Sequence, residues 1–391
     1  MKASVRGVAF CLSSAQARGT SSDCAPVVLV SQPRMHWHGT YNNGLDYSTR
    51  MTASEPDDRY SRQVLFHGIG PGGQRKLAAS TVAIVGCGAT GSALASLLAR
   101  SGVGNIRILD RDYVEASNLQ RQSLFDEADA AESMPKAIAA ARKIAAFNSQ
   151  IEVEAKVADL TPSNIDELLS GTQIVLDGTD NFETRYLIND YAVKNSIPWI
   201  YTAAVGSYGV SMNVLPSQTA CLVCIFPEFP QGAFETCETA GILGSAVNLA
   251  ASIAATEAIK LLVGAHDRLR RTLLSFDVWS NERSEIAADK PRPGCRVCGK
   301  RDFVHLAGQG RPHITMCGRN SVQIHERHKP LDFSQMTELL KPHGTVRHND
   351  FVLKFWRDPY EMTLFPDGRA IIKGTSDTAI ARSLYARFVG S

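Results

Sequence analysis

A glycine-rich segment places the strongest constraint on how this chain can fold. Residues 86–91 read Gly-Cys-Gly-Ala-Thr-Gly and match the pattern G-x-G-x-x-G. An apolar, β-branched run at 81–86 leads into it and an Ala- and Leu-rich stretch at 90–101 follows, which predicts a buried strand, a tight turn and a helix. Because glycines allow close backbone approach and the helix start offers free N–H groups, we expect the turn to bind a phosphate-bearing ligand.

The same alternation of strands and helices continues along the chain. Apolar runs predict strands at 105–110, 151–157, 173–177, 199–204, 210–215 and 273–278, and helices at 134–147, 162–170, 182–195 and 241–263. Strands that alternate with helices favour a mostly parallel sheet covered on both faces. The predicted fold class is therefore α/β, with a doubly wound, Rossmann-like sheet in a domain over 56–305.

Both ends of the chain differ from this central region. Residues 1–55 are rich in Ser, Gly, Ala and Asn and show no sustained period, so we expect a disordered or non-native N-terminal extension. Residues 312–391 contain strand-like runs at 350–356, 361–364 and 369–373 and helix-like runs at 334–340 and 378–388. They predict a small α+β C-terminal domain.

Asp110 narrows the class of ligand. It ends the strand after the glycine turn, about twenty residues on, where an acidic side chain suits a ribose hydroxyl. The turn and this carboxylate indicate an adenosine-containing ligand, and by themselves they favour NAD or FAD and hence an oxidoreductase. A glycine turn without a ligand remains the structural alternative.

Polar side chains beyond the ribose position are unusual for a simple dehydrogenase. They lie near predicted strand ends, which converge at the carboxyl edge of a parallel sheet. These residues are Asn118, Arg121, Lys136, Asp180 and Asn181. Cationic side chains neutralise a triphosphate, and a carboxylate such as Asp180 can hold Mg²⁺. The group indicates ATP chemistry at a phosphate rather than hydride transfer.

The cysteines favour a metal site over disulfides. The chain has nine, an odd number, and four of them form two C-x-x-C pairs, Cys221 with Cys224 and Cys295 with Cys298. Two such pairs can supply the four thiolates of a tetrahedral, structural Zn²⁺ site. A redox pair and simple packing remain alternatives. Thiols used in this way indicate a reducing, cytoplasmic setting.

Taken together, these segments resemble the ThiF/MoeB family of sulfur-carrier adenylyltransferases, bacterial relatives of the ubiquitin-activating enzymes. The resemblance covers residues 59–299: Arg-Tyr-Ser-Arg-Gln at 59–63, the glycine turn, Ser-Asn-Leu-Gln-Arg-Gln at 117–122, Pro-Lys at 135–136, Thr-Asp-Asn at 179–181 and the two cysteine pairs. It implies that the C-terminal glycine carboxylate of a ubiquitin-like sulfur carrier attacks the α-phosphate of ATP, giving an acyl-adenylate and pyrophosphate. It also implies a homodimer, and it favours a zinc site over a redox pair or simple packing as the role of the cysteine pairs.

The resemblance assigns a role to each matching residue. The nucleotide would be held by Gly86, Gly88, Ala89 and Gly91, and its ribose would contact Asp110. Its phosphates would contact Asn118, Arg121 and Lys136. Asp180 would bind the Mg²⁺ ion, with Asn181 beside it, and Arg62 would act as an arginine finger that reaches the partner subunit's site. All of these roles are expectations that follow from the resemblance.

Cys237 is a candidate for sulfur chemistry. It lies in a polar segment just before the helix predicted at 241–263, where a thiol can be nucleophilic. The resemblance associates it with a thioester or persulfide on the carrier, and would add a sulfur donor such as a cysteine desulfurase as a partner. A packed thiol in a crossover loop is the alternative.

The identity of the carrier and the setting of the protein are further expectations. The tail at 312–391 resembles those of some ThiF-like proteins, which favours ThiS and thiamine thiazole biosynthesis, with MoaD and molybdenum cofactor biosynthesis as the alternative. A net charge of +2 gives no reason to expect nucleic acid. The longest apolar stretch, 241–263, contains Glu257 and Lys260, so we expect a buried helix and no membrane partner.

Overall fold

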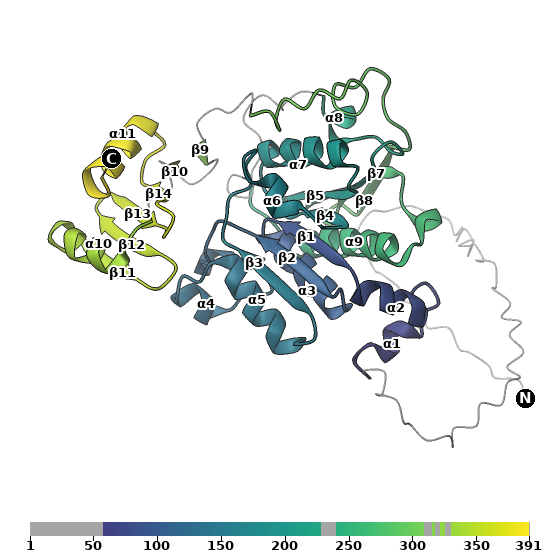
Figure 1. The fold of residues 1–391 in the computed structure, drawn as a ribbon, viewed down its shortest axis with the longest axis horizontal. Helices are drawn as coiled ribbons and strands as arrows, with labels where there is room; N and C mark the ends of the chain where they lie inside the picture. The colour runs from purple at the N-terminus through teal and green to yellow at the C-terminus, as the bar shows by residue number, and fades with distance from the viewer. Residues whose placement is uncertain (1–57, 228–239, 309–314, 317–320, 325–329, 391) are drawn as a thin grey trace, which may run out of the picture. The chain divides into compact units, whose positions relative to one another are not determined.

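The structure, a computed structural model, describes residues 58–227, 240–308, 315–316, 321–324 and 330–390 (Figure 1). The segment 1–55 and Cys237 lie outside these residues. The proposed domain limits at 56–305 and 312–391 stay predictions. The described residues form two sheets, one before and one after residue 308.

Eight strands form the main sheet, in the order β3-β2-β1-β4-β5-β6-β7-β8. Their bounds are Thr81–Val85 (β1), Asn105–Leu109 (β2), Glu152–Lys156 (β3), Ile174–Asp177 (β4), Trp199–Val205 (β5), Tyr208–Val214 (β6), Thr272–Asp277 (β7) and Glu282–Ala287 (β8). The strands from β3 to β5 are parallel, and β6, β7 and β8 continue the sheet antiparallel. The predicted α/β class with a mostly parallel sheet is confirmed.

The edge strand β8 has no counterpart in the sequence prediction. Its residues, Glu-Arg-Ser-Glu-Ile-Ala, are all exposed. A strand that buries neither face has no apolar run to mark it, because its only constraint is backbone pairing with β7. The pairing of neighbouring strands, not a hydrophobic pattern, therefore sets this edge.

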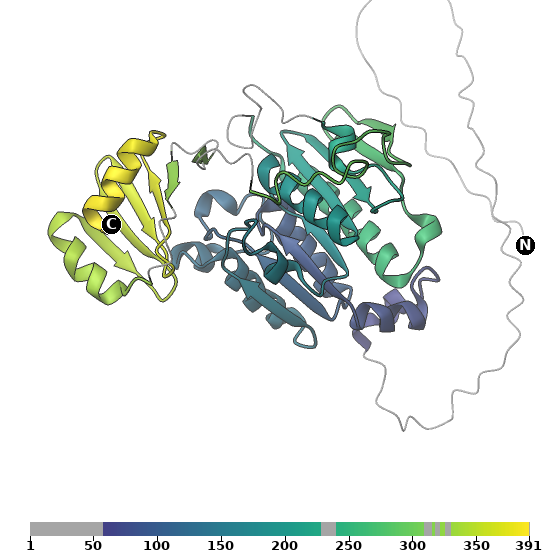
Figure 2. The same cartoon turned by 45° about the horizontal axis from the view of Figure 1, so that its top comes forward.

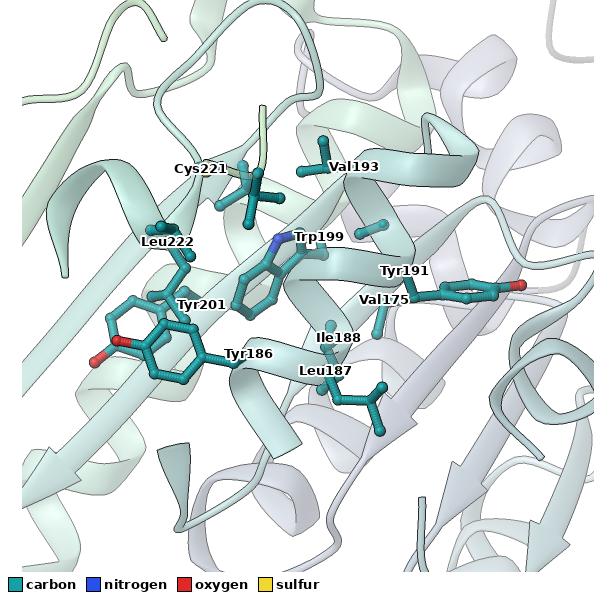
Figure 3. Close-up of a cluster of buried hydrophobic side chains, with 14 of the residues drawn as sticks. Val175, Tyr186, Leu187, Ile188, Tyr191, Val193, Trp199, Tyr201, Cys221 and Leu222 are labelled. Carbon is teal, nitrogen blue, oxygen red and sulfur yellow. The ribbon is translucent and has the colours of Figure 1, made fainter. Parts of the chain in front are cut away.

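Helices cover both faces of the main sheet (Figures 1 and 2). The longer ones are α2 (Gly70–Ala78), α3 (Ala89–Arg100), α5 (Lys136–Phe147), α7 (Phe182–Asn195) and α9 (Gly244–Val263); the short ones are η1 (Asp58–Tyr60), α1 (Ser61–Val64), η2 (Ala116–Asn118), α4 (Glu127–Ala131), α6 (Ile165–Leu169), α8 (Leu222–Ile225) and η3 (His266–Arg268). Side chains of α3, α5 and α9 share one buried cluster, and those of α6 and α7 share another. Figure 3 shows the second cluster, with Trp199 of β5 among residues of α7. The predicted doubly wound arrangement follows from these two cores.

The helix α9 is long and apolar enough, by length and composition, to cross a membrane. Half of it is buried, and it packs against α3 and β5. Its Glu257 accepts hydrogen bonds from Asn213 Nδ2 at 2.5 Å and from Lys260 Nζ at 2.6 Å. The paired charges and the buried alanines are those of a core helix, as the sequence predicts.

Three glycines allow α3 to start directly against the sheet. Gly86 has a φ of 84°, a conformation that side chains rarely adopt. A Cβ on Gly91 would lie 1.8 Å from the carbonyl oxygen of Gly86, and a Cβ on Gly178 would lie 2.2 Å from the same oxygen. The turn after β1 and the turn after β4 therefore touch through bare backbone.

The second sheet is antiparallel, in the order β11-β12-β13-β14-β10-β9. Its strands are Thr315–Met316 (β9), Ser321–Ile324 (β10), Thr345–His348 (β11), Leu353–Arg357 (β12), Tyr360–Leu364 (β13) and Ala370–Lys373 (β14), and its helices are α10 (Phe333–Leu340), η4 (Lys341–His343) and α11 (Thr378–Phe388). α10 and α11 pack on this sheet in a third cluster. The helices and β12 to β14 lie where the sequence predicts them, whereas β9, β10 and β11 were not predicted.

A buried ion pair joins α7 to β4. Arg185 Nε donates to Asp177 Oδ2 at 2.8 Å, and both side chains are buried. In Arg185→Met the aspartate stays buried without its partner, so we expect the free energy of unfolding to fall by about 3–5 kcal/mol in urea titrations. Arg283→Met is the control: it removes an exposed pair with Glu285 and should cost about 0.5 kcal/mol or less. Equal losses for both variants would contradict the prediction.

Candidate nucleotide site and cysteine cluster

Asp110 lies at the carboxyl end of β2, next to the glycine turn. Its Oδ2 accepts the N–H of Cys87 at 2.5 Å, and its Oδ1 accepts the N–H of Asp112 at 2.6 Å. Burial raises the pKa of the Asp110 carboxyl, and the nearby Lys136 ammonium opposes that rise. Two backbone hydrogen bonds thus orient the carboxylate at the place where the sequence predicts a ribose contact.

Lys136 is the first residue of α5 and is 4% exposed. Its N–H donates to the carbonyl oxygen of Asp112 at 2.9 Å, and its Nζ lies 3.2 Å from Asp112 Oδ2. It also interacts electrostatically with Asp110. The structure therefore brings this cation to the same sheet edge as Asp110, as predicted for a phosphate contact.

Asn118 ends η2 and is completely buried. Its Oδ1 accepts the N–H of Glu115 at 3.2 Å, which fixes the side-chain amide. Its Nδ2 has no hydrogen-bond partner, and an unpaired buried donor is costly unless a ligand accepts from it. Arg121, three residues on, donates from its guanidinium to Ser117 O at 2.9 Å. The amide is a donor that a phosphate oxygen would satisfy.

The turn after β4 holds Asp180 at the same edge of the sheet. Asp177 Oδ1 accepts the N–H and the hydroxyl of Thr179 at 2.9 and 2.7 Å. Asn181 caps α7, with its Oδ1 accepting the N–H of Thr184 at 2.8 Å. Asp180 stands exposed between these two anchored residues. An exposed carboxylate on a rigid turn can bind a hydrated divalent ion. In contrast, Asn181 has a structural role as a cap.

Arg111 belongs to this edge and was missed by the sequence analysis. Its guanidinium lies 3.1 Å from Asp159 Oδ2. Burial alone would lower the pKa of Arg111, but Asp159, Asp112 and Asp180 together raise it. Its position directly after Asp110, at the end of a predicted strand, was the sequence feature that could have identified it. Arg111 links the end of β2 to Asp159, which follows β3.

Arg62 is not brought to the glycine turn within one chain. It is exposed on α1, and its neighbour Gln63 donates to Ser101 O at 2.8 Å, just past the C-terminal end of α3. The glycine turn lies at the other end of this helix of 12 residues, which spans about 18 Å. A role at the nucleotide would thus require a second subunit, and that role stays a prediction.

The four cysteines of the two C-x-x-C pairs form one cluster, with all Sγ atoms within 4.8 Å of one another. The Sγ atom of Cys221 lies 3.7 Å from the Sγ atoms of Cys224 and Cys295, and the Sγ atom of Cys224 lies 3.3 Å from that of Cys298. Tetrahedral Zn–S bonds of about 2.3 Å place sulfurs about 3.8 Å apart. Because four thiols converge at that spacing, the cluster could hold a zinc ion, with no open position for catalysis.

The residues at the sheet edge fit an adenosine triphosphate better than a redox cofactor. The buried ammonium of Lys136 interacts with Asp110, and the turn that carries the exposed carboxylate of Asp180 touches the glycine turn; the buried amide of Asn118, eight residues after Asp110, has an unpaired donor. Cations and donors of this kind neutralise and orient phosphates. Hydride transfer does not call for such a set, which disfavours the oxidoreductase alternative.

Comparisons with known proteins agree with this geometry. The model of the ThiF family matches residues 60–297, and the chain belongs to the ThiF family. The sulfur carrier protein ThiS adenylyltransferase of Bacillus subtilis is 45% identical over 336 residues, which are 85% of this chain and 99% of that protein. The sulfur carrier protein adenylyltransferase of Thermus thermophilus is 35% identical over 249 residues, 62% of this chain and 90% of that one.

A solved structure that shares the fold contains ATP. The crystal structure of E. coli MccB with ATP superposes with a TM-score of 0.53 at 26% identity, covering 62% of this chain and 75% of that chain. The predicted family and the predicted adenylyltransferase class are therefore confirmed. The roles of individual residues stay predictions.

The cysteine cluster leads to a test of metal content. We expect about one Zn²⁺ per chain by elemental analysis of the purified protein, and none after Cys295→Ser, because a structural site needs all four thiolates. Cys87→Ser is the matched control, since Cys87 is a buried cysteine outside the cluster. Zinc retained in Cys295→Ser, or none in the parent chain, would contradict the assignment.

Proposed function

We propose that this chain adenylates the C-terminal glycine carboxylate of a ubiquitin-like sulfur carrier, most closely of the ThiS type, and thereby serves thiamine thiazole biosynthesis. One observation carries the proposal: Asp110 accepts a hydrogen bond from the glycine turn, Lys136 lies close enough to interact with Asp110, and the turn that leads to Asp180 touches Gly86 and Gly91. Relatives named as sulfur-carrier adenylyltransferases support it.

The chemistry is attack of a carboxylate oxygen on the α-phosphorus of ATP. A bond forms between the two, the bond to the β,γ-diphosphate breaks, and pyrophosphate leaves with the electron pair. The glycine turn and Asp110 would hold the nucleoside, while Lys136, Arg121 and Asn118 Nδ2 would stabilise the charge that develops on the phosphates. Asp180 would bind Mg²⁺, which neutralises phosphate oxygens when bound.

The proposal also names the type of carrier protein and the donor of the sulfur. A curated relative of the same family is a ThiS adenylyltransferase, whereas others are named adenylyltransferase and sulfurtransferase MOCS3. A MoaD-type carrier, for molybdenum cofactor biosynthesis, is therefore the alternative substrate. We further propose a cysteine desulfurase as sulfur donor and a cytoplasmic location, where the cysteine cluster would stay reduced.

A homodimer would complete the site by supplying Arg62 from the partner. Trp279, in the turn between β7 and β8, is 81% exposed, the largest exposed fraction among the big apolar side chains of the described residues. Tryptophan is enriched among the residues that anchor protein interfaces. We propose that Trp279 contributes to the contact between subunits.

The experiment that tests the function is carrier-dependent exchange of labelled pyrophosphate into ATP, run with purified ThiS and MoaD proteins. We expect exchange with ThiS and a rate lower by about 10²-fold or more in Asp180→Ala, because the metal-binding carboxylate is lost. Asp267→Ala, which removes an exposed acid far along the chain, should exchange like the parent. Absence of exchange with every carrier would refute the function, and full activity of Asp180→Ala would refute the metal role.

A variant of Cys237 tests carboxylate activation and sulfur transfer separately. In Cys237→Ala we expect normal pyrophosphate exchange, because adenylation uses no thiol, together with loss of carrier thiocarboxylate in an assay with a cysteine desulfurase and cysteine. Mass spectrometry of the carrier gives the readout. Normal thiocarboxylate formation in the variant would show that Cys237 is dispensable.

A further inference from the structure

A tyrosine next to the nucleotide site is packed against the second sheet. Tyr113 lies three residues after Asp110, and its side chain shares a buried cluster with Val352, Phe365 and Ile371. Its hydroxyl lies 3.4 Å from Thr363 Oγ1. The segment between Asp110 and η2 is therefore covered by residues from β13, β14 and their connections.

Lys373, at the end of β14, reaches the same segment. Its Nζ lies 2.5 Å from Glu115 Oε1 and 5.6 Å from the centre of the Tyr113 ring. Burial alone would lower the pKa of Lys373, but Tyr113, Glu115 and Glu361 raise it above its usual value. The Lys373 and Glu115 side chains are 24% and 19% exposed, so solvent screens this pair less than a surface ion pair.

Glu115 connects this ion pair to the amide that the nucleotide site leaves unpaired. Its carbonyl oxygen accepts the N–H of Asn118 at 2.8 Å, and its own N–H donates to Asn118 Oδ1 at 3.2 Å. This reciprocal cap fixes both the turn η2 and the orientation of the Asn118 amide. Movement of Glu115 would therefore turn Asn118 Nδ2 away from the position that it holds here.

A second contact restrains the neighbouring part of the site. Asn349 Nδ2 donates to the carbonyl oxygen of Glu132 at 2.6 Å, four residues before Lys136. The guanidinium of Arg142 on α5 lies 6.0 Å from the centre of the Phe351 ring. Two segments, the one before Asn118 and the one before Lys136, thus contact the C-terminal part of the chain.

We propose that Lys373 is a positioning residue for nucleotide binding, which acts through Glu115 to hold Asn118 in the orientation that meets a phosphate. The inference rests on the proposed function and assigns the C-terminal sheet the role of an internal brace of the ATP site. Docking of the carrier on this sheet is the competing role, and the two predict different kinetic effects.

The test compares Lys373→Met with Lys373→Arg in the full-length chain. We expect Lys373→Met to raise the Kd for ATP, measured by calorimetry without carrier, and the KM for ATP in pyrophosphate exchange by about fivefold to tenfold. The KM for the carrier should stay unchanged. Lys373→Arg keeps the charge and should restore both ATP constants to within about twofold. Lys341→Met, which removes an exposed pair with Glu338, is the control in the same region and should match the parent.

Three results would overturn the proposal. An unchanged Kd for ATP in Lys373→Met, a rise in the KM for the carrier alone, or an equal defect in Lys373→Arg would each assign the residue another role. A thermal midpoint for Lys373→Met close to that of the parent shows that the comparison concerns folded protein. If no carrier supports exchange, the proposed function fails, but the Kd for ATP still tests the brace.

Discussion

The contact between the bare backbone of two turns, those after β1 and β4, is the constraint on which the rest of the structure depends. Gly86, Gly91 and Gly178 lie so close that a Cβ on Gly91 or Gly178 would fall within 1.8–2.2 Å of a carbonyl oxygen. This approach lets α3 begin against β1 and β4 and points its free N–H groups across the sheet edge.

Charged groups around the turn are arranged by pairing with one another. Lys136 is held by Asp112, Arg111 by Asp159, and Arg185 by Asp177. Buried charges require such partners, because an isolated one costs several kcal/mol or more. The pairs leave Asp180 exposed and the Asn118 amide with an unpaired donor. A polar site therefore lies at the edge of an otherwise apolar core.

Much of the central fold could be predicted from local pattern. The strands β1, β2 and β4 and the helices α3, α5 and α7 lie within a few residues of their predicted positions, because each buries an apolar run of the right period. The edge strand β8 could not be predicted, since all its residues are exposed. Arg111 and Glu115 were also missed, because a single charged residue in a loop carries no periodic signal.

The sequence by itself determined the glycine turn, the acid that follows it, the family and the four cysteines, because each depends on residue type at short spacing. Only the tertiary structure decided which charges pair and which groups remain free. Cys221 and Cys295 are 74 positions apart, and Glu115 and Lys373 are 258 apart. Contacts of that separation arise from the packing of whole sheets and helices, so no local pattern records them. The residues of the proposed adenosine site could be named from the sequence, whereas the contact of residues 113 and 115 with the C-terminal sheet exists only in the folded chain.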